Sequence, residues 1–135
     1  MIKATIHQEP YVTHISSETN TLIADEPIDL GGKNTGMSPT ELLASSLVAC
    51  TCITLRMYAN RKQWDVKSIE THINIVNQEA SNTTIFERNI NFTGNIDKVQ
   101  TDRLLDIANH CPVHKVLTHS IIINTSINDG DNKKI

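Results

Sequence analysis

This sequence has few aromatic residues and only a small net charge. Phe, Trp and Tyr together make up 4% of its 135 residues, so a hydrophobic core must be built mainly from Ile, Leu, Val and Ala. Twelve Lys and Arg stand against fifteen Asp and Glu, scattered along the chain, for a net charge of -3. No basic stripe is available to neutralise phosphates, and we therefore expect no nucleic-acid partner.

The N-terminus lacks the apolar run of a secretory signal. It reads MIKATIHQEP, in which an acidic residue and a proline arrive before an apolar run could reach the length of a signal peptide. We therefore expect a cytoplasmic protein, where cysteines are more often buried, metal-binding or catalytic than paired in structural disulfides. The three cysteines, Cys50, Cys52 and Cys111, are thus the first candidates for chemistry.

The length of the chain favours one domain, which we expect over residues 1–128, followed by a polar tail at residues 129–135. Residues 2–24 are rich in Ile, Val and Thr and predict a small antiparallel meander. Residues 25–37 carry a proline and three glycines without apolar periodicity, which predicts a loop.

Three local signals predict a long helix after this loop. Ser38 can cap free N–H groups, Pro39 suits the first turn, and Glu41 stands three residues after the cap. Helical spacing persists to about Asn60, and because the helix is apolar or small on nearly all sides, we expect it to be buried. That surface exceeds what the few strands of one chain can cover, which predicts a homodimer. Hydroxyl residues inside the helix, with Glu41 and Arg56 near its ends, argue against a membrane span.

The second half of the chain predicts a hairpin followed by two shorter elements. Apolar residues alternate over residues 69–75 and 86–92, as in two strands with one buried face. Asp97 and Gln100 have the spacing of a capping box that opens another helix, whose inner side ends at Cys111. The elements expected after it are a short helix over residues 112–119 and a last strand over residues 120–127.

The cysteines differ in their expected surroundings. Cys50 lies in the middle of the long helix on a stripe with Leu47 and Met57, where a free cysteine is most often an inert small hydrophobe. Cys111 stands directly before Pro112 at a predicted helix start, where free N–H groups and the positive end of the helix dipole stabilise a thiolate. It is either a reactive thiol or a packing residue.

Two further arrangements of cysteine and histidine bear on the chemistry. Cys52 points to roughly the opposite side of the helix from Cys50, because each residue turns a helix by about 100°. These two thiols therefore cannot act together while the helix holds. His110, Cys111 and His114 fall within five residues and offer a weak metal-binding pattern. Surface histidines that flank a helix start are the competing interpretation.

Two motifs then resemble a known family. Residues 25–66, DEPIDLGGKNTGMSPTELLASSLVACTCITLRMYANRKQWDV, resemble the central segment of OsmC-like proteins, the OsmC/Ohr family. The shared elements are the DEP, the GG before the helix, SP-x-ELL at its start and A-C inside it. A second family element, a Cys-Pro pair that leads a short helix, is present as CPVHKVL at residues 111–117. The resemblance covers almost the whole chain.

This resemblance implies both a fold and a reaction. The fold is α+β, with a long central buried helix and a second helix packed against antiparallel sheets in an intertwined homodimer. The activity is that of a thiol-dependent hydroperoxide reductase in oxidative stress defence. Cys50 would attack the O–O bond of a small hydroperoxide to give a sulfenic acid, and Cys111 would resolve it as a disulfide. An external dithiol would restore the pair, and neither a cofactor nor a metal is expected.

The chain departs from the best-characterised branch of that family at one point. That branch holds the thiolate with an N-terminal arginine and positions the arginine with a glutamate directly after the helix-opening proline. This chain has no arginine before Arg56, and Thr40 follows the proline. The available arginines are Arg56, Arg61, Arg88 and Arg103. Two alternatives to the enzyme are a non-catalytic dimeric binding module and a Cys/His metal-binding protein.

Overall fold

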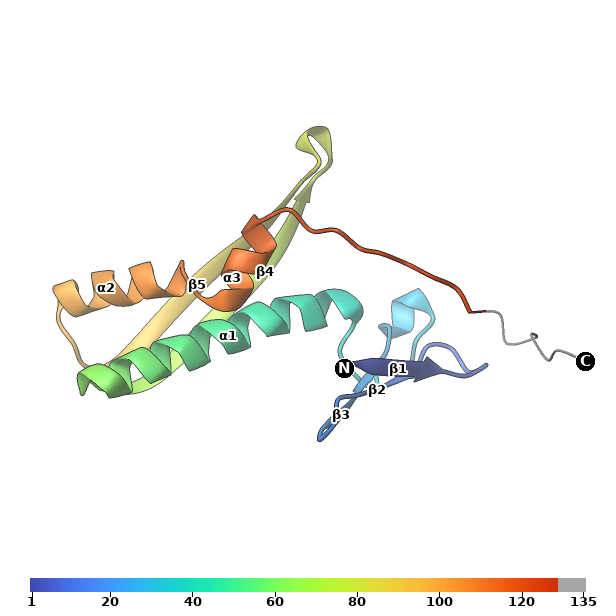
Figure 1. The fold of residues 1–135 in the computed structure, drawn as a ribbon, viewed down its shortest axis with the longest axis horizontal. Coiled ribbons are helices and arrows are strands. Elements are labelled where there is room, and N and C mark those ends of the chain that lie inside the picture. The colour runs from blue at the N-terminus through green and yellow to red at the C-terminus, as the bar shows by residue number, and fades with distance from the viewer. Residues whose placement is uncertain (129–135) are drawn as a thin grey trace, which may run out of the picture.

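The computed structural model describes residues 1–128 and shows two antiparallel sheets and three α-helices in that range. A long helix runs along a β-hairpin, the two shorter helices lie on the same hairpin, and a small N-terminal sheet stands beyond the start of the long helix (Figure 1). The elements are β1 Lys3–Ile6, β2 Thr13–Ser16, β3 Thr21–Ala24, α1 Pro39–Lys62, β4 Asp65–Gln78, β5 Thr83–Asn95, α2 Lys98–Ala108 and α3 Pro112–Thr118. The polar tail predicted at residues 129–135 lies outside the described residues.

The predicted N-terminal meander is confirmed as an antiparallel sheet with the order β1-β2-β3. The loop that follows it is organised around the buried carboxylate of Asp25. This carboxylate accepts hydrogen bonds from the Thr35 hydroxyl at 2.7 Å and from the backbone N–H groups of Glu26, Lys33 and Thr35. The Thr35 hydroxyl is the main cause that lowers the pKa of Asp25 to about 2, although burial acts in the opposite direction. At Gly32 a Cβ would overlap the carbonyl of Glu26, so the loop closes only around a glycine.

The local signals at the start of α1 are confirmed. The Ser38 hydroxyl accepts a hydrogen bond from the Glu41 N–H, and the Glu41 carboxylate accepts one from the Ser38 N–H at 2.8 Å. The helix ends at Lys62, the following residue Gln63 adopts the left-handed conformation, and the Trp64 N–H closes the last turn on the Ala59 carbonyl. Capping at both ends therefore fixes the length of the helix that carries Cys50.

The predicted hairpin is confirmed as β4 and β5, which are joined by a short 3₁₀ turn at Glu79–Ser81. Alternate residues on one face of each strand are half-buried. These are Ile69, Thr71, Ile73 and Ile75 of β4, and Phe86, Arg88, Ile90 and Phe92 of β5. Arg88 is thus a charged residue between apolar neighbours on the inward face of β5.

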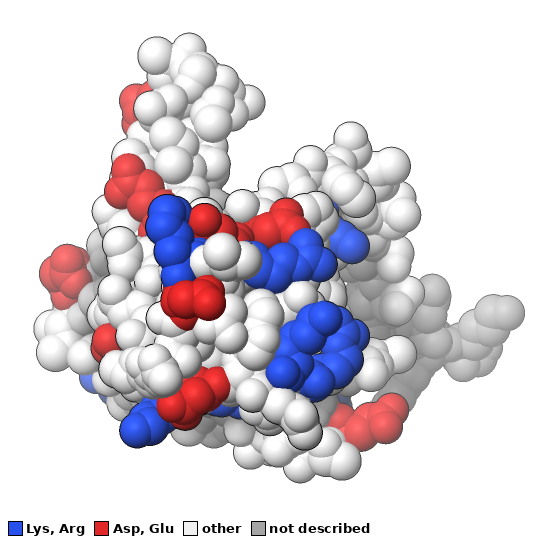
Figure 2. Space-filling view, turned by 90° about the vertical axis from the view of Figure 1, so that its left-hand side faces the viewer, with Lys and Arg blue, Asp and Glu red and all other residues white. Residues whose placement is uncertain are grey.

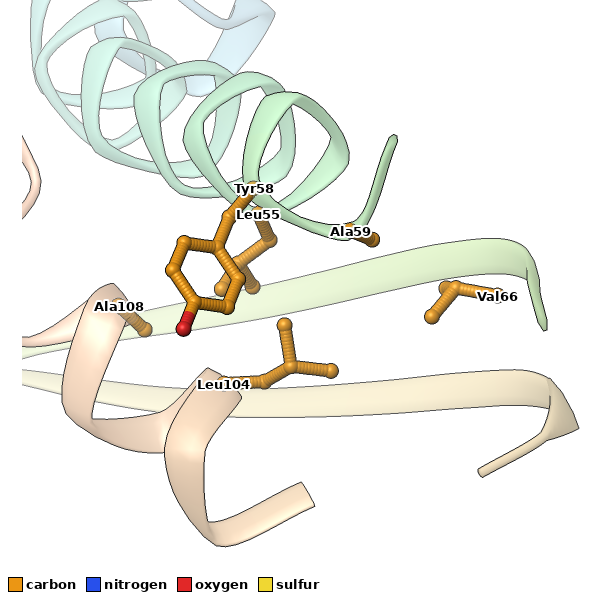
Figure 3. Close-up of a cluster of buried hydrophobic side chains, with 6 residues drawn as sticks. All are labelled: Leu55, Tyr58, Ala59, Val66, Leu104 and Ala108. Carbon is orange, nitrogen blue, oxygen red and sulfur yellow. The ribbon is translucent and has the colours of Figure 1, made fainter. Parts of the chain in front are cut away.

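The hydrophobic core lies between the second half of α1, the base of the hairpin and α2 (Figure 3). Its buried members are Leu55, Tyr58, Ala59, Val66, Leu104 and Ala108. The predicted capping box of α2 is also present, since Asp97 and Gln100 bond each other's backbone N–H groups at 2.8 and 2.9 Å. This core fixes α1 and α2 on the hairpin and so determines where their cysteines lie.

Charges of both signs are mixed over the end of the molecule formed by the end of α1 and the start of α2 (Figure 2). Lys98 pairs with Asp102 and Arg103 with Asp106 along α2. The Arg103 Nε–H also donates to the Tyr58 hydroxyl at 3.0 Å, and this bond is the main cause of a lowered Tyr58 pKa. This face therefore presents no uniform basic surface.

The long helix is less covered in the single chain than its composition predicts. One side, which includes Leu47, Thr51 and Leu55, is buried, whereas Ile53 and Met57 are 60% and 68% exposed. By length and composition alone α1 could cross a membrane, with a mean hydropathy of 1.5. Core helices share this property, and α1 packs against β4, α2 and α3 along its buried side. The expectation of all-round burial is therefore not met by one copy of the chain.

The prediction of a last strand over residues 120–127 is wrong for the single chain. These residues are extended but pair with no strand among residues 1–128, and they run out from α3 away from the hairpin (Figure 1). Ile122 and Ile123 are each 83% exposed. A strand needs the edge of a neighbouring strand to hydrogen-bond its backbone N–H and C=O groups. In the described part of the single chain no sheet edge lies beside this segment.

Candidate functional site

The Cys50 sulfur lies at the N-terminus of α3. It projects from the middle of α1, is half-buried, and accepts a hydrogen bond from the Val113 N–H at 3.4 Å. The Thr54 hydroxyl lies 4.0 Å from the same sulfur. An N–H in the first turn of a helix has no partner within its own helix and carries part of the positive end of the helix dipole. The Val113 N–H is therefore free to donate to a group outside its own helix, and in this structure that group is the Cys50 sulfur.

Cys111 occupies the N-cap position of α3, directly before Pro112. Its side chain is fully buried and makes no capping hydrogen bond, while its carbonyl accepts from the Lys115 N–H at 3.1 Å. The sequence places the free N–H groups of this helix start beside Cys111, but the structure directs one of them to Cys50. The two cysteines are thus brought to the same helix start, with Cys50 bonded two residues beyond Cys111.

Cys52 faces away from this helix start, as its position two residues from Cys50 predicts. Its sulfur lies 3.3 Å from the Thr71 hydroxyl and 4.0 Å from the Ile69 carbonyl, both on β4. The three cysteines are free. Cys52 is therefore a thiol of the helix–hairpin interface, on the other side of α1 from the candidate site.

Arg88 joins three elements beside the two cysteines. Its guanidinium donates to the Thr51 hydroxyl and to the Asn109 side-chain carbonyl, each at 3.0 Å, and lies 3.3 Å from Nδ1 of His114. These partners belong to α1, to the residue that caps the end of α2, and to α3. The sequence offers four arginines with no means of choosing among them, because Arg88 reaches this place only through the pairing of β5 with β4 and the packing of α1 on the hairpin.

His114 is held as a neutral ring by its surroundings. Burial is the first cause that lowers its pKa, and the charges of Arg88 and His110 act in the same direction. Since Arg88 has only N–H groups to offer, the bond between them requires Nδ1 of His114 to accept. The charged member of this group is therefore Arg88.

The weak metal-binding pattern at His110, Cys111 and His114 does not form a cluster. Nδ1 of His110 bonds to the carbonyl of Asp106 at 2.7 Å, His114 bonds to Arg88, and Cys111 is buried between the helices. Within residues 1–128, no group of three or more His, Cys, Asp or Glu side chains is arranged to hold a metal.

A cavity of about 950 Å³ adjoins this network on the inward face of β5. Its walls include Leu47 of α1, Phe86 and Arg88 of β5, and His114 and Leu117 of α3. None of the cysteines is among the residues that line this cavity, which shares Arg88, Asn109 and His114 with the network described above.

Comparisons with known proteins agree with this architecture. A family model described as OsmC-like protein matches residues 32–126. Among solved structures, a protein from Psychrobacter arcticus described as an osmotic stress induced and detoxification response protein is 26% identical, with a TM-score of 0.71 over 85% of each chain. An OsmC-like protein from Mycoplasma pneumoniae is 16% identical, with a TM-score of 0.72 over 87% of this chain and 85% of its own.

The organic hydroperoxide resistance protein OhrB of Bacillus subtilis is also similar. It is 19% identical, with a TM-score of 0.59 over 87% of this chain and 89% of its own. At 16% and 19% identity, the Mycoplasma and Bacillus structures support the fold alone. A search of curated proteins found no match.

Proposed function

Because this chain belongs to the OsmC-like protein family, we propose that it is a thiol-dependent reductase of organic hydroperoxides. The family includes peroxide-reducing OsmC and Ohr proteins. The observation that supports the proposal is the hydrogen bond from the Val113 N–H to the Cys50 sulfur at the helix start where Cys111 is the N-cap residue. In this role Cys50 is the attacking thiol and Cys111 the resolving one.

The proposed reaction follows from this arrangement. The Cys50 thiolate attacks one oxygen of the hydroperoxide, the O–O bond breaks, and the alkoxide leaves and takes up a proton to become an alcohol. Cys50 is thereby oxidised to a sulfenic acid. The Cys111 sulfur attacks the Cys50 sulfur, a disulfide forms, and the hydroxyl group leaves as water. An external dithiol returns two electrons and becomes a disulfide itself.

The N–H of Val113 has a defined task in the first step. The thiolate and not the thiol is the nucleophile, and the Val113 N–H would hold the Cys50 sulfur in place for its attack on the peroxide. The half-buried position of Cys50 leaves its sulfur accessible to a small peroxide, whereas Cys111 is fully buried. Burial suits a sulfur that reacts only with a neighbour in the same protein.

Consumption of cumene hydroperoxide in the presence of a dithiol tests the proposal. Cys50→Ser should abolish turnover. Cys52→Ser is the matched control, because it removes a half-buried thiol from the same helix at its β4 side, and it should keep the wild-type rate. A Cys50→Ser variant that still turns over would refute the assignment. A wild type that consumes no hydroperoxide and whose thiols resist alkylation would be the non-catalytic binding module instead.

We also propose that the working form is a homodimer. The apolar residues of α1 that the single chain leaves exposed, Ile53 and Met57, lie on the same side of the helix as Cys50. The exposed extended segment at residues 120–127 gives a second unpaired apolar surface. Large exposed apolar surfaces on a soluble protein are commonly covered by a partner. A second copy on this side of α1 would lie beside the candidate site.

A further inference from the structure

Arg88 is a half-buried cation without an acidic partner in the described part of the chain. The ion pairs among residues 1–128 involve Lys33, His72, Lys98, Arg103 and His110, and none of them includes Arg88. Its guanidinium bonds only to neutral groups, and its neighbours on the inward face of β5 are apolar. A charge that leaves water in this way is costly unless an anion or hydrogen bonds compensate it.

The other arginines are committed to places away from the cysteines. Arg56 donates to the backbone carbonyls of Val66 and Lys67 at the start of β4. Arg103 donates to the Tyr58 hydroxyl and pairs with an acidic residue of its own helix. Arg61 lies over the ring of the same tyrosine. Arg88 is therefore the arginine that the fold connects to the candidate site.

The partners of Arg88 lie on both sides of the contact that Cys50 makes. Thr51 is the residue after Cys50 in α1, and His114 is the residue after Val113 in α3. One end of the guanidinium bonds to Thr51 and the other to His114. The Arg88 side chain therefore links α1 to α3 next to the hydrogen bond from the Val113 N–H to the Cys50 sulfur. The Thr51 hydroxyl is itself fixed, because it donates to the Leu47 carbonyl at 2.7 Å.

We propose that Arg88 is a positioning residue for Cys50, which holds the first turn of α3 against α1 and so keeps the Val113 N–H on the Cys50 sulfur. This inference rests on the proposed function in that it gives Cys50 the role of the nucleophile. It adds a residue that neither the family match nor the sequence motifs assign.

The test measures the thiol directly, so that it does not depend on peroxide turnover. In a Cys52→Ser background, the rate of Cys50 alkylation by iodoacetamide is followed across pH, and the modified residue is identified by mass spectrometry. The other titratable groups around the site are His114 on α3, His110 before it and the Cys111 thiol. His114→Asn, measured in parallel, separates the titration of that ring from the effect of the arginine.

Arg88→Met removes both the hydrogen bonds and the charge. We expect alkylation of Cys50 at pH 7 to slow by about tenfold and its pH profile to change, because the Val113 N–H is no longer held on the sulfur; a tenfold change is of the order expected for loss of one hydrogen bond to a charged group. Arg88→Lys keeps the charge without the planar fork and should recover part of the rate. Arg103→Met is the matched control, since it removes an arginine that bridges two elements far from the cysteines, and it should leave the profile unchanged.

Each outcome decides the inference. If Arg88→Met and Arg103→Met lower the melting temperature alike and leave the alkylation profile unchanged, Arg88 is only structural and the inference is wrong. If Arg88→Met does not fold, Arg88→Lys and Thr51→Val provide the same measurement, and an unchanged profile in both overturns it. A profile that depends on Arg88 in a protein that consumes no hydroperoxide would refute the proposed function while the inference stands.

Discussion

The exposed apolar side of α1 allows a quantitative test of the proposed dimer through Ile53→Asp. Ile53 is 60% exposed in the single chain. Full burial of an isoleucine side chain contributes about 1.5–3 kcal/mol, so covering the exposed part contributes about 1–2 kcal/mol per subunit on the same scale. In a dimer with twofold symmetry the change occurs twice, which gives about 2–4 kcal/mol, or roughly 30- to 1,000-fold in the dissociation constant.

Sedimentation equilibrium measures this constant, with circular dichroism as a check that helix content is kept. Burial of the new carboxylate adds to the loss, so the estimate is a lower limit. Val99→Asp is the matched control, because Val99 is 77% exposed in the first turn of α2, where an acidic residue is favourable. A wild type that is monomeric at micromolar concentration, or an Ile53→Asp variant with the wild-type constant, would refute the reasoning.

Three further predictions concern the cysteines and the loop before α1. Cys111→Ser should undergo one oxidation, detected by a sulfenic-acid probe on Cys50, but should not recycle with dithiol; normal turnover would contradict the resolving role. Stoichiometric hydroperoxide should give a Cys50–Cys111 disulfide and leave Cys52 free, as peptide mapping can show; a dominant bridge through Cys52 would contradict the assignment. Asp25 has a lowered pKa of about 2, so its contribution to stability is present above about pH 4 and is lost as pH falls toward 2. Acid titration monitored by circular dichroism should therefore show Asp25→Asn less stable than wild type near pH 6, with the difference vanishing at low pH; an unchanged difference at pH 2 would contradict it.

The elements that the sequence predicts well are those specified by neighbouring residues. The capping boxes at Ser38 and Asp97 need only residues three positions apart, and both are observed. The alternation of the hairpin is likewise local, because it depends on a period of two along each strand. Sequence reasoning also separated Cys50 from Cys52, since the turn of a helix between two residues is fixed.

Features that depend on distant parts of the chain could not be predicted. Both sides of α1 are apolar, so its composition does not show which side meets the hairpin, and Met57 of the expected stripe is exposed. The link from Arg88 to Thr51 spans 37 positions and follows from the packing of α1 on the hairpin of β4 and β5. The strand expected over residues 120–127 has the right composition, but strand formation requires an edge that composition does not supply.

The complete burial of Cys111 determines which sulfur of the proposed disulfide an external thiol can reach. When an external thiol reduces a disulfide, it must reach one of the two sulfurs along the S–S axis. Cys111 has no exposed surface, whereas Cys50 is half-buried. Electrons can therefore enter only through Cys50, which would carry the mixed disulfide with the reductant while Cys111 departs as the leaving group. The sulfur that meets the oxidant and the sulfur that meets the reductant would then be the same atom, so peroxide and reductant would compete for one approach to the protein.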